Sequence, residues 1–470
     1  MLLQGRSMEN EGFSTGVDQP FFKGMTAMKK LSTLLLAAGM LCAASSPASA
    51  VDVKMDGEYL FSYIIGERLA SGDNFDNAGQ RMRLGMTFSA SENLSGYLQL
   101  QTGIAQDANN GYDWGTDTTG RNSNIAVRQA YMDWMIPQTP VKIRMGKQLI
   151  GLPADAFGKN AIMHPGWGGR DGVVVSSPVA DWLDLTAFWV RSSYTAVNGN
   201  DTDMSRKSDM FSVAAMFNFD GVSFTPYVMY GALDAGASVP GSTDGMLTVA
   251  DANAYWFGSN FMLSYFDPFT LKVSGAYGTA NYEGSGAPND REGWYVQAKA
   301  SYKTAYGTPI LGGWYGSGDS SSVKYARQNW IPTNAGRFHP TTALGSGEFG
   351  LYDTNTRHNI AGTWGVQAGI EDVSFMEDLS HKFTVTLWKG TNSDAHSAGY
   401  TPLAYMTTSD AAVEFNLAST YNIYKNLTAV LELAYIINDF DYSDHKAAYG
   451  KKSDMDKDSW SAALNFAYKF

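Results

Sequence analysis

Histidine is the residue type from which this chain could most readily build a catalytic or metal site, and the sequence has six of them. Their spacing matches no zinc motif and they fall among loops and strand ends, which favours solvated or packed rings over ligands. No nucleophile elbow or phosphate-binding loop is present, and no Ser/His pair stands out that would suit a barrel lipase. The histidines are His164, His339, His358, His381, His396 and His445. We therefore expect a protein that is not an enzyme.

Three stretches are rich in aspartate, and carboxylate oxygens are the ligands that Ca²⁺ prefers. The sets are Asp107, Asp113 and Asp117; Asp439, Asp441 and Asp444; and Asp454, Asp456 and Asp458. None has the spacing of an EF-hand, which favours solvated acidic loops over a defined ion site. We expect no cofactor, and keep Asp439, Asp441 and Asp444 as weak Ca²⁺ candidates. Bridging to anionic lipid by divalent ions is a weaker alternative.

The stretch 151–172, GLPADAFGKNAIMHPGWGGRDG, could set the charge of a pore. It lacks the alternation of the segments around it and carries Asp155, Lys159, Arg170 and Asp171. Its apolar residues suit a buried wall better than an outer surface. We therefore expect it to fold back into the lumen of a barrel, with its charges facing water. An ordinary extracellular loop is the alternative.

Basic residues on early strands form the predicted counterpart of this loop. Arg81, Arg83, Lys142 and Arg144 share the polar parity of their segments, and would therefore face the lumen. Acids and bases that face each other across a narrow opening make a transverse field, which sorts solutes by charge. Scattered lumen charge with no local field is the alternative reading.

The elements that must position these residues are β-strands. The final segment, WSAALNFAYKF from Trp460 to Phe470, alternates between an apolar face and a polar or small face, with aromatic rings at both ends of the apolar face. Such a profile suits a strand that crosses a bilayer. The same alternation recurs from Val51 onward and predicts an all-β fold, a transmembrane antiparallel β-barrel of 18 strands. The weakest strand assignments are 173–177 and 308–316, and losing that pair would give 16.

Long polar loops and short turns alternate between the predicted strands, and the polar stretch 66–79 is taken as the first long loop. This rhythm predicts long extracellular loops, short periplasmic turns, and both termini on the periplasmic side. Because an unpaired backbone group in hydrocarbon costs several kcal/mol, the last strand must pair with the strand near Val51. Arg128 interrupts the register of its strand and predicts a β-bulge or an end effect. A barrel of this size is too wide for side chains to fill, so its interior should be an aqueous channel.

Targeting signals and charge fit this assignment. Residues 28–50 have the basic start, short apolar run and small cleavage residues of a signal peptide, and we interpret 1–27 as an extension upstream of the true start codon. The porin barrel would span 51–470. Cys42, the one cysteine, lies within the signal and follows Leu41, which argues against lipidation; the mature chain would then have no disulfide. A formal net charge of −12 makes nucleic acid a poor partner.

Two segments carry a resemblance to a known family. Residues 51–59, VDVKMDGEY, and 128–134, RQAYMDW, together with the signal peptide, the loop rhythm and the terminal Phe470, resemble the trimeric general porins of the bacterial outer membrane, and most closely the homotrimeric porins of sulfate-reducing bacteria. The resemblance covers 28–470. It implies a homotrimer whose third loop folds into the lumen opposite a basic wall. By that analogy Asp155 and Asp171 lie on the loop side, and Arg81, Arg83 and Arg128 on the wall. Lys159 and Arg170 depart from the family's acidic loop.

The function expected from these observations is passive diffusion of small hydrophilic solutes and ions through the outer membrane, with selectivity set by the charged constriction. A substrate-specific channel for a sugar or organic acid is the first alternative, for which lumen aromatics such as Tyr131, Tyr315 and Trp388 would argue. A structural or adhesive barrel with a plugged lumen is a second alternative. The expected surroundings are outer-membrane lipid and other copies of the same chain.

Overall fold

The computed structural model describes residues 51–69, 72–102, 112–113, 125–163, 169–193, 206–236, 249–284, 289–333, 338, 340–343, 360–449 and 451–470. By its internal contacts the chain divides into two units, Met1–Asp52 and Val53–Phe470. The predicted upstream extension and signal peptide lie outside the described residues.

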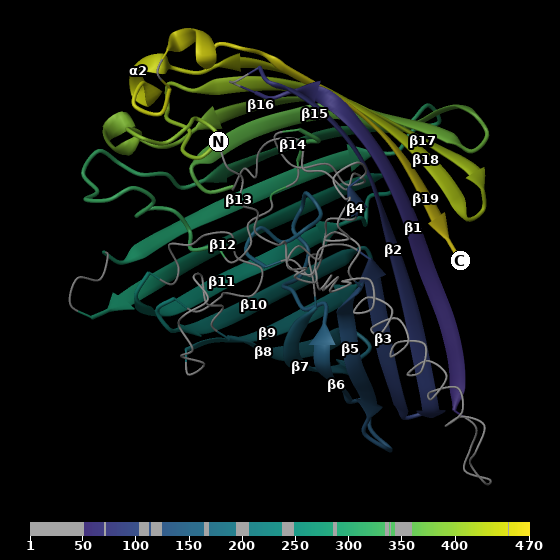
Figure 1. Ribbon diagram of the computed structural model, residues 1–470. Coiled ribbons are helices and arrows are strands. Elements are labelled where there is room, and N and C mark those ends of the chain that lie inside the picture. The colour runs from purple at the N-terminus through teal and green to yellow at the C-terminus, as the bar shows by residue number, and fades with distance from the viewer. Residues whose placement is uncertain are drawn as a thin grey trace, which may run out of the picture. The chain divides into compact units, whose positions relative to one another are not determined.

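The second unit is a closed antiparallel barrel of eighteen long strands, as the alternation predicted, plus the two-residue β4 (Tyr112–Asp113) paired to β2 (Figure 1). The strands are β1 (Asp52–Glu67), β2 (Asn74–Ser91), β3 (Leu94–Thr102), β5 (Ile125–Met135), β6 (Lys142–Gln148), β7 (Arg170–Ala180), β8 (Leu183–Ser193), β9 (Lys207–Phe219), β10 (Val222–Leu233), β11 (Asp251–Leu263), β12 (Phe269–Glu283), β13 (Arg291–Tyr302), β14 (Thr308–Gly316), β15 (Thr363–Met376), β16 (Leu379–Gly390), β17 (Ala411–Tyr424), β18 (Leu427–Asp439) and β19 (Ser459–Lys469). The two weakest predicted strands are real, as β7 and β14, so the alternative of 16 strands is wrong.

The seam of the barrel joins the two ends of the unit. β1 and β19 pair in register from Glu58 opposite Lys469 to Gly66 opposite Ser461, as expected from the need to leave no strand edge in lipid. Gly57 and Phe470 extend the ladder, with the Gly57 N–H donating to the Phe470 carbonyl at 2.8 Å. A Cβ on Gly57 would overlap the Phe470 ring, so the terminal ring can pack here because residue 57 is glycine.

The connections alternate in length as predicted, with one correction. Short turns join β2 to β3, β5 to β6 and each later pair up to β17 and β18, at the end of the barrel where β1 begins and β19 stops. The first connection is shorter than expected, because β1 continues to Glu67 and β2 starts at Asn74. Polar residues remain in the ladder there, since strand pairing uses backbone groups whatever the side chain.

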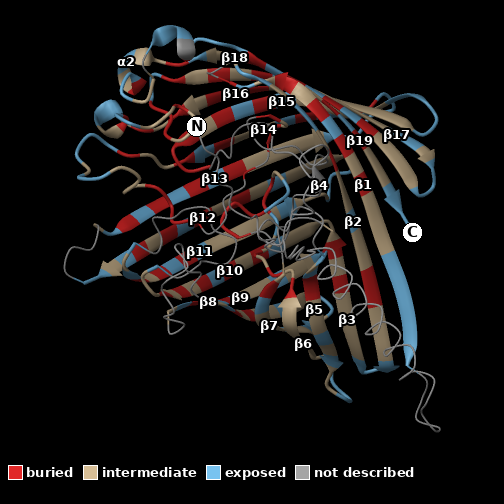
Figure 2. Ribbon diagram, in the orientation of Figure 1, coloured by how far each residue is buried: buried red, intermediate tan, exposed pale blue. Residues whose placement is uncertain are grey.

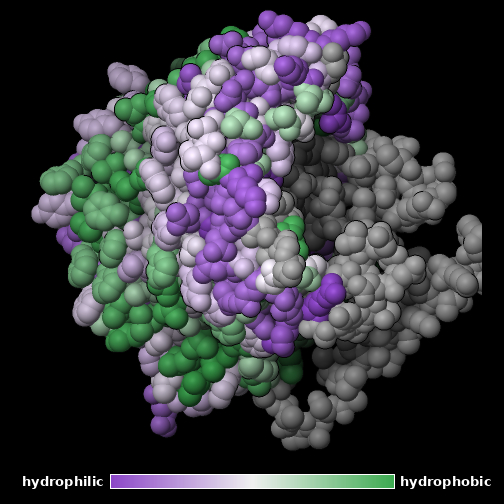
Figure 3. Space-filling model, turned by 90° about the vertical axis from the view of Figure 1, so that its left-hand side faces the viewer, coloured by the Kyte–Doolittle hydropathy of each residue, from purple (hydrophilic) through white to green (hydrophobic). Residues whose placement is uncertain are grey.

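The two faces of the barrel wall differ as the sequence predicted. On β10, Phe224 and Val228 are exposed, whereas Tyr227 and Met229 between and beside them are buried toward the inside (Figure 2). In Figure 3 hydrophobic side chains gather in a broad band on the outer side of the barrel, and hydrophilic side chains gather toward one end. An apolar outer band of this kind matches lipid hydrocarbon.

No helix among the described residues is long and apolar enough to cross a membrane.

The predicted irregularity at Arg128 is a β-bulge. Opposite β3, Gln99 pairs with Gln129 and Leu100 pairs with Val127, so Arg128 is the extra residue on β5. The bulge turns two successive side chains, Arg128 and Gln129, into buried positions, which strict alternation would forbid.

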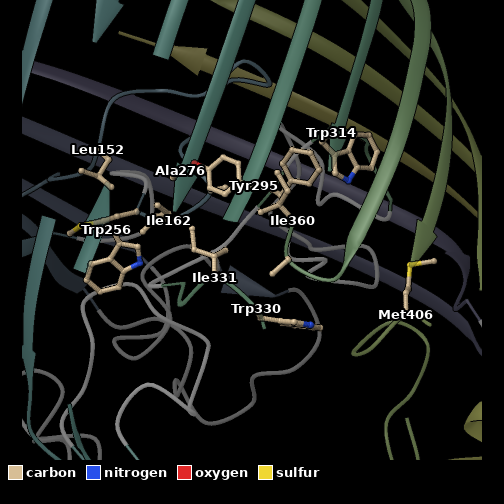
Figure 4. Close-up of a cluster of buried hydrophobic side chains, with 14 of the residues drawn as sticks. Leu152, Ile162, Trp256, Ala276, Tyr295, Trp314, Trp330, Ile331, Ile360 and Met406 are labelled. Carbon is tan, nitrogen blue, oxygen red and sulfur yellow. The ribbon is translucent and has the colours of Figure 1, made fainter. Parts of the chain in front are cut away.

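Inside the barrel, residues from the long connections pack on the inner wall. The cluster in Figure 4 joins Leu152 and Ile162 of the β6–β7 connection to Trp256 on β11 and Tyr295 on β13. These loop residues are as buried as a protein core, because the loops pack on the inner wall and occupy part of the lumen, which strand side chains alone do not fill.

A buried ion pair ties two of the long connections together. His445 ends the short helix α2 (Tyr442–His445), and its Nε2 lies 2.8 Å from Oδ2 of Asp410, with both side chains inaccessible to solvent. The His445 Nδ1 lies 2.9 Å from the Tyr400 carbonyl oxygen. A carbonyl and a carboxylate can only accept, so the ring satisfies both by donating from both nitrogens, as imidazolium does.

The pH dependence of this contact follows from its charge. Burial lowers the pKa of His445, but the hydrogen bond and charge of Asp410, with smaller help from the Tyr400 carbonyl and Asp444, outweigh it and raise that pKa above its ordinary value. A raised pKa in the folded state stabilises the contact fully below pH about 6.5, and the stabilisation is lost as pH rises through the folded value.

We predict that amide hydrogen exchange in 440–449, corrected for the intrinsic rate, speeds up as pH is raised from about 6.5 through the raised pKa of His445, the range in which this imidazolium loses its proton. His445→Gln should abolish this dependence, since glutamine does not titrate. His396→Gln is the matched control, because His396 binds the Val323 carbonyl at 2.7 Å elsewhere in the loops, and it should retain the dependence. Protection that stays flat with pH in the unmodified protein would contradict the imidazolium assignment.

Candidate functional site

The connection from β6 to β7 folds into the barrel, as predicted for 151–172, and docks on the inner wall formed by later strands. The Ala154 carbonyl accepts a hydrogen bond from Asn260 on β11 at 2.8 Å, and the Asn160 amide lies 3.4 Å from the Tyr227 hydroxyl on β10. Further contacts reach Tyr295 on β13 and Trp314 on β14, six and seven strands beyond β7 in the sheet, so the loop spans the lumen. The reading of an ordinary extracellular loop is therefore wrong for its described part, 149–163.

Asp155 is the polar anchor of this loop. Its Oδ2 accepts hydrogen bonds from the Ala161 N–H at 2.8 Å, the Tyr295 hydroxyl at 2.9 Å and the Gln297 amide at 3.1 Å. The residue is only 4% exposed. Burial raises the pKa of Asp155 to about 7, although the hydrogen bonds from Ala161, Tyr295 and Gln297 act in the opposite direction.

Aromatic packing completes the docking. The Phe157 ring meets the Trp314 ring edge-on, with centroids 5.9 Å apart, and Phe338 from a later connection at 5.7 Å. Gly312 makes room, since a Cβ there would lie 2.7 Å from Phe157 Cζ. Edge-to-face pairs add roughly 0.5–1.5 kcal/mol each beyond burial, so the loop is held by both apolar and polar contacts.

The charges of the loop are placed differently from the expectation. Asp155 faces the wall of β13 rather than the basic wall across water, because the buried tyrosine and glutamine offer it donors. Arg170 and Asp171 belong to β7, not to the loop; alternation turns Arg170 inward, where it donates to the Ile150 carbonyl, and Asp171 outward. Lys159 is exposed at the tip of the loop.

The predicted basic wall is present on β2. Arg81 and Arg83 both reach Glu58 on β1, at 2.7 Å and 3.7 Å, and Arg83 also donates to Gln101 at 2.8 Å. All three charged side chains have inward parity. The carboxylate that holds the two guanidinium groups was not among the predicted site residues, although Glu58 shares the polar face of its strand.

Arg128 joins this wall from the bulge on β5. Its Nη1 donates to Oε1 of Gln99 at 2.7 Å, and Gln129 donates to the same oxygen at 2.9 Å. The bulge therefore adds a third guanidinium group to the inner wall beside β2 and β3. A second acid of β1, Asp56, accepts a hydrogen bond from Tyr97 on β3, so the acids of this wall are also on the polar face of β1.

A second basic group continues the wall on β6. Lys142 and Arg144 bind the Asp133 carboxylate at 2.9 Å and 2.6 Å. The Arg144 guanidinium lies over the Tyr131 ring, 4.0 Å from its centroid, and that ring packs against Tyr97 at 5.2 Å. Cations and aromatic faces thus alternate along the wall.

The predicted lumen aromatics and acidic loop residues are only partly where they were expected. Trp388 and Tyr131 lie on the inner face, but Tyr315 does not; it has the outward parity of β14 and stacks on Trp294.

Among the described residues no group of three His, Cys, Asp or Glu side chains could hold a metal ion. Asp441 caps α2 and Asp444 accepts from Thr407 at 2.8 Å, so they do not gather with Asp439 as Ca²⁺ ligands.

Comparison with known proteins finds likeness in structure alone. No family model and no curated protein matches the sequence. Solved structures that match include OccK1 (OpdK) of Pseudomonas aeruginosa, with 13% identity, a TM-score of 0.56 and coverage of 89% of this chain and 98% of that one. OpdL of the same organism has 10% identity, a TM-score of 0.54 and coverage of 89% and 99%. OccAB2 of Acinetobacter baumannii has 14% identity, a TM-score of 0.54 and coverage of 89% and 98%.

At such identities the likeness shows the fold. The barrel of eighteen strands is that of outer-membrane proteins such as OpdK, and with its apolar outer band it belongs in the bacterial outer membrane. The finer resemblance to porins of sulfate-reducing bacteria finds no support in these comparisons. The constriction role of the predicted site residues stays a prediction.

We predict that Asp155→Ala loosens the lumen loop. The change leaves Tyr295 and Gln297 without their acceptor, and each buried polar group left without a partner lowers stability by roughly 1–3 kcal/mol. Limited proteolysis of the purified barrel should therefore cut 151–163 at least about tenfold faster. Asp171→Ala removes an outward carboxylate nearby in sequence and should leave the rate unchanged. Equal rates in the two variants would show that Asp155 does not hold the loop.

Proposed function

We propose that this barrel is a channel that passes small organic carboxylates along its basic wall. The observation that carries the proposal is the surplus of positive charge there. By strand parity, the inner faces of β1, β2, β3, β5 and β6 carry six basic residues against four acidic ones: Lys54, Arg81, Arg83, Arg128, Lys142 and Arg144 against Asp52, Asp56, Glu58 and Asp133. Guanidinium groups bind carboxylates in a two-pronged geometry that lysine cannot offer. A solute that moves along this wall exchanges one such partner for the next.

The aromatic rings of the wall favour carboxylates that carry a ring of their own. Tyr97 and Tyr131 pack together, and Arg144 covers one face of Tyr131. An aromatic solute could stack there while its carboxylate meets the arginines. One of the similar structures is P. aeruginosa OpdK with vanillate, an aromatic carboxylate. That ligand belongs to OpdK, and here it suggests the probe.

Unselective diffusion of small hydrophilic solutes and ions is the second candidate. It follows from the width of an 18-stranded lumen, and it differs from the first in having no saturable site. The homotrimer implied by the sequence resemblance stays a prediction, and neither candidate depends on it.

We predict that Arg81→Gln combined with Arg83→Gln shifts the zero-current potential in a salt gradient toward cation preference, and raises the vanillate concentration for half-block of single-channel current by about tenfold or more. Each lost hydrogen bond between a guanidinium group and the vanillate carboxylate reduces the binding free energy by roughly 1.5–3 kcal/mol, and the remaining basic residues of the wall offset part of that loss. The measurement is planar-bilayer recording of the purified protein.

Arg191→Gln is the matched control. Arg191 also pairs with an acid, Asp209 at 2.7 Å, but it has the outward parity of β8. It should change neither quantity. If vanillate did not block the unmodified channel saturably, the result would favour unselective diffusion. If the double variant kept the ion preference of the unmodified channel, the basic wall would have no part in selectivity.

A further inference from the structure

β3 carries no charged residue on its inner face, although it pairs with the charged strands β2 and β5 on its two sides (Figure 1). Its inward residues are Ser95, Tyr97, Gln99 and Gln101. The two glutamines hold arginines of the neighbouring strands: Gln101 accepts from Arg83 at 2.8 Å, and Gln99 accepts from Arg128 at 2.7 Å. A neutral strand therefore supplies acceptors for two guanidinium groups of the basic wall.

Hydrogen bonds on both sides fix the direction of the Gln99 amide. Its oxygen accepts from Arg128 Nη1 at 2.7 Å and from Gln129 Nε2 at 2.9 Å, and its nitrogen donates to the Tyr97 hydroxyl at 3.2 Å. A guanidinium group can only donate, so an amide turned the other way would bring two sets of donors together. Gln99, Arg128 and Gln129 are all buried, so bonds lost in this way would be costly.

The Tyr97 hydroxyl can accept from Gln99 because its own proton is used on its other side. It donates to the Asp56 carboxylate, which reaches it from β1 across β2. Gly85 on β2 gives the two groups room to meet, since a Cβ there would lie 2.4 Å from the Tyr97 hydroxyl and 2.6 Å from an Asp56 carboxylate oxygen. Every donor from Arg128 onward thus points toward Asp56, and the hydrogen bonds of such a chain strengthen one another.

We propose that Gln99 is a positioning residue for the ion preference of the channel, and that Tyr97 sets its direction. The amide oxygen holds the Arg128 guanidinium without adding a negative charge beside it, unlike the Glu58 carboxylate that binds Arg81 at 2.7 Å. The role rests on the proposed function, in which the charge of Arg128 acts on passing carboxylates.

The direction of the expected effect follows from the acids nearby. Glu58 lies close enough for its charge to act on Arg128. Without its amide acceptor, Arg128 turns toward this carboxylate, because a charge-assisted hydrogen bond is stronger than a neutral one. Its charge is then matched by Glu58 and attracts a passing anion less.

Tyr97→Phe tests the role by removing a single oxygen atom. The ring keeps its packing on Tyr131, with centroids 5.2 Å apart, while Gln99 loses the acceptor that sets its direction. In planar-bilayer recordings of the purified protein, the zero-current potential in a salt gradient should shift toward cation preference. The vanillate concentration for half-block should rise about threefold, the effect of one neutral hydrogen bond.

Gln99→Met removes the amide and should shift both quantities further in the same direction. It also leaves Gln129 without its acceptor and could prevent assembly of the barrel, so Tyr97→Phe is the deciding variant.

A double-mutant cycle separates positioning from a general loosening of β3. In an Arg128→Gln background no guanidinium group is left for Gln99 to hold, so adding Tyr97→Phe should shift the zero-current potential no further. A loosened strand would shift it in both backgrounds. Equal shifts with and without Arg128, or no shift in Tyr97→Phe alone, would overturn the proposal.

Tyr59→Phe is the matched control. Tyr59 donates to Gln80 at 2.8 Å, and both side chains have outward parity, on β1 and β2. The change therefore removes a hydrogen bond between a tyrosine and a glutamine from the outer face and should alter neither quantity. A shift as large as that of Tyr97→Phe would also overturn the proposal.

The two measurements distinguish this proposal from the proposed function. If vanillate did not block the unmodified channel, but Tyr97→Phe shifted the potential only when Arg128 was present, the carboxylate channel would be refuted and the positioning role kept. If vanillate blocked the unmodified channel and Tyr97→Phe matched it in both quantities, the positioning role would be refuted and the carboxylate channel kept.

Discussion

The hydrogen bonds between β1 and β19 are the constraint on which the rest of the structure depends. A strand edge left open in hydrocarbon would expose backbone groups at several kcal/mol each, so the sheet must close. Closure with antiparallel neighbours requires an even number of long strands, and eighteen of them enclose a lumen that strand side chains cannot fill. The long connections fold inward and occupy part of this lumen, which explains why loop residues such as Ile162 and Ile331 are completely buried.

Filling the lumen divides the polar residues of the inner wall into two kinds. Tyr295, Gln297, Gln367 and Glu414 bind loop segments, and they satisfy backbone or side-chain groups that would otherwise be buried without partners. The arginines of β2 and β5 bind other wall residues instead, and they outnumber the carboxylates beside them. A polar residue on the inner wall is therefore not by itself evidence of a solute site. It is a candidate for binding a solute only if no loop segment already binds it.

Local pattern predicted most of the fold, because side-chain parity is a property of neighbouring residues. It predicted the strands, the faces, the closing pair and even the irregularity at Arg128. It failed where position depends on distant contacts. Asp155 was expected to face the basic wall, but its donor Tyr295 lies 140 residues later in the chain. Asp171 was misplaced because its parity depends on β7 beginning at Arg170, and the carboxylate of Glu58 was missed because no short-range signal links it to Arg81.

The distribution of charge, rather than its total, governs what such a lumen can accept. The whole chain carries a formal net charge of −12, which alone would disfavour anions. In salt the field of a charge fades over about 8–10 Å, so acids on distant loops act weakly on a solute at the inner wall. A carboxylate beside Arg83 meets mainly the guanidinium groups around it. An acidic barrel can therefore present a cationic wall, because the field at that wall is set by the charged groups within hydrogen-bonding reach.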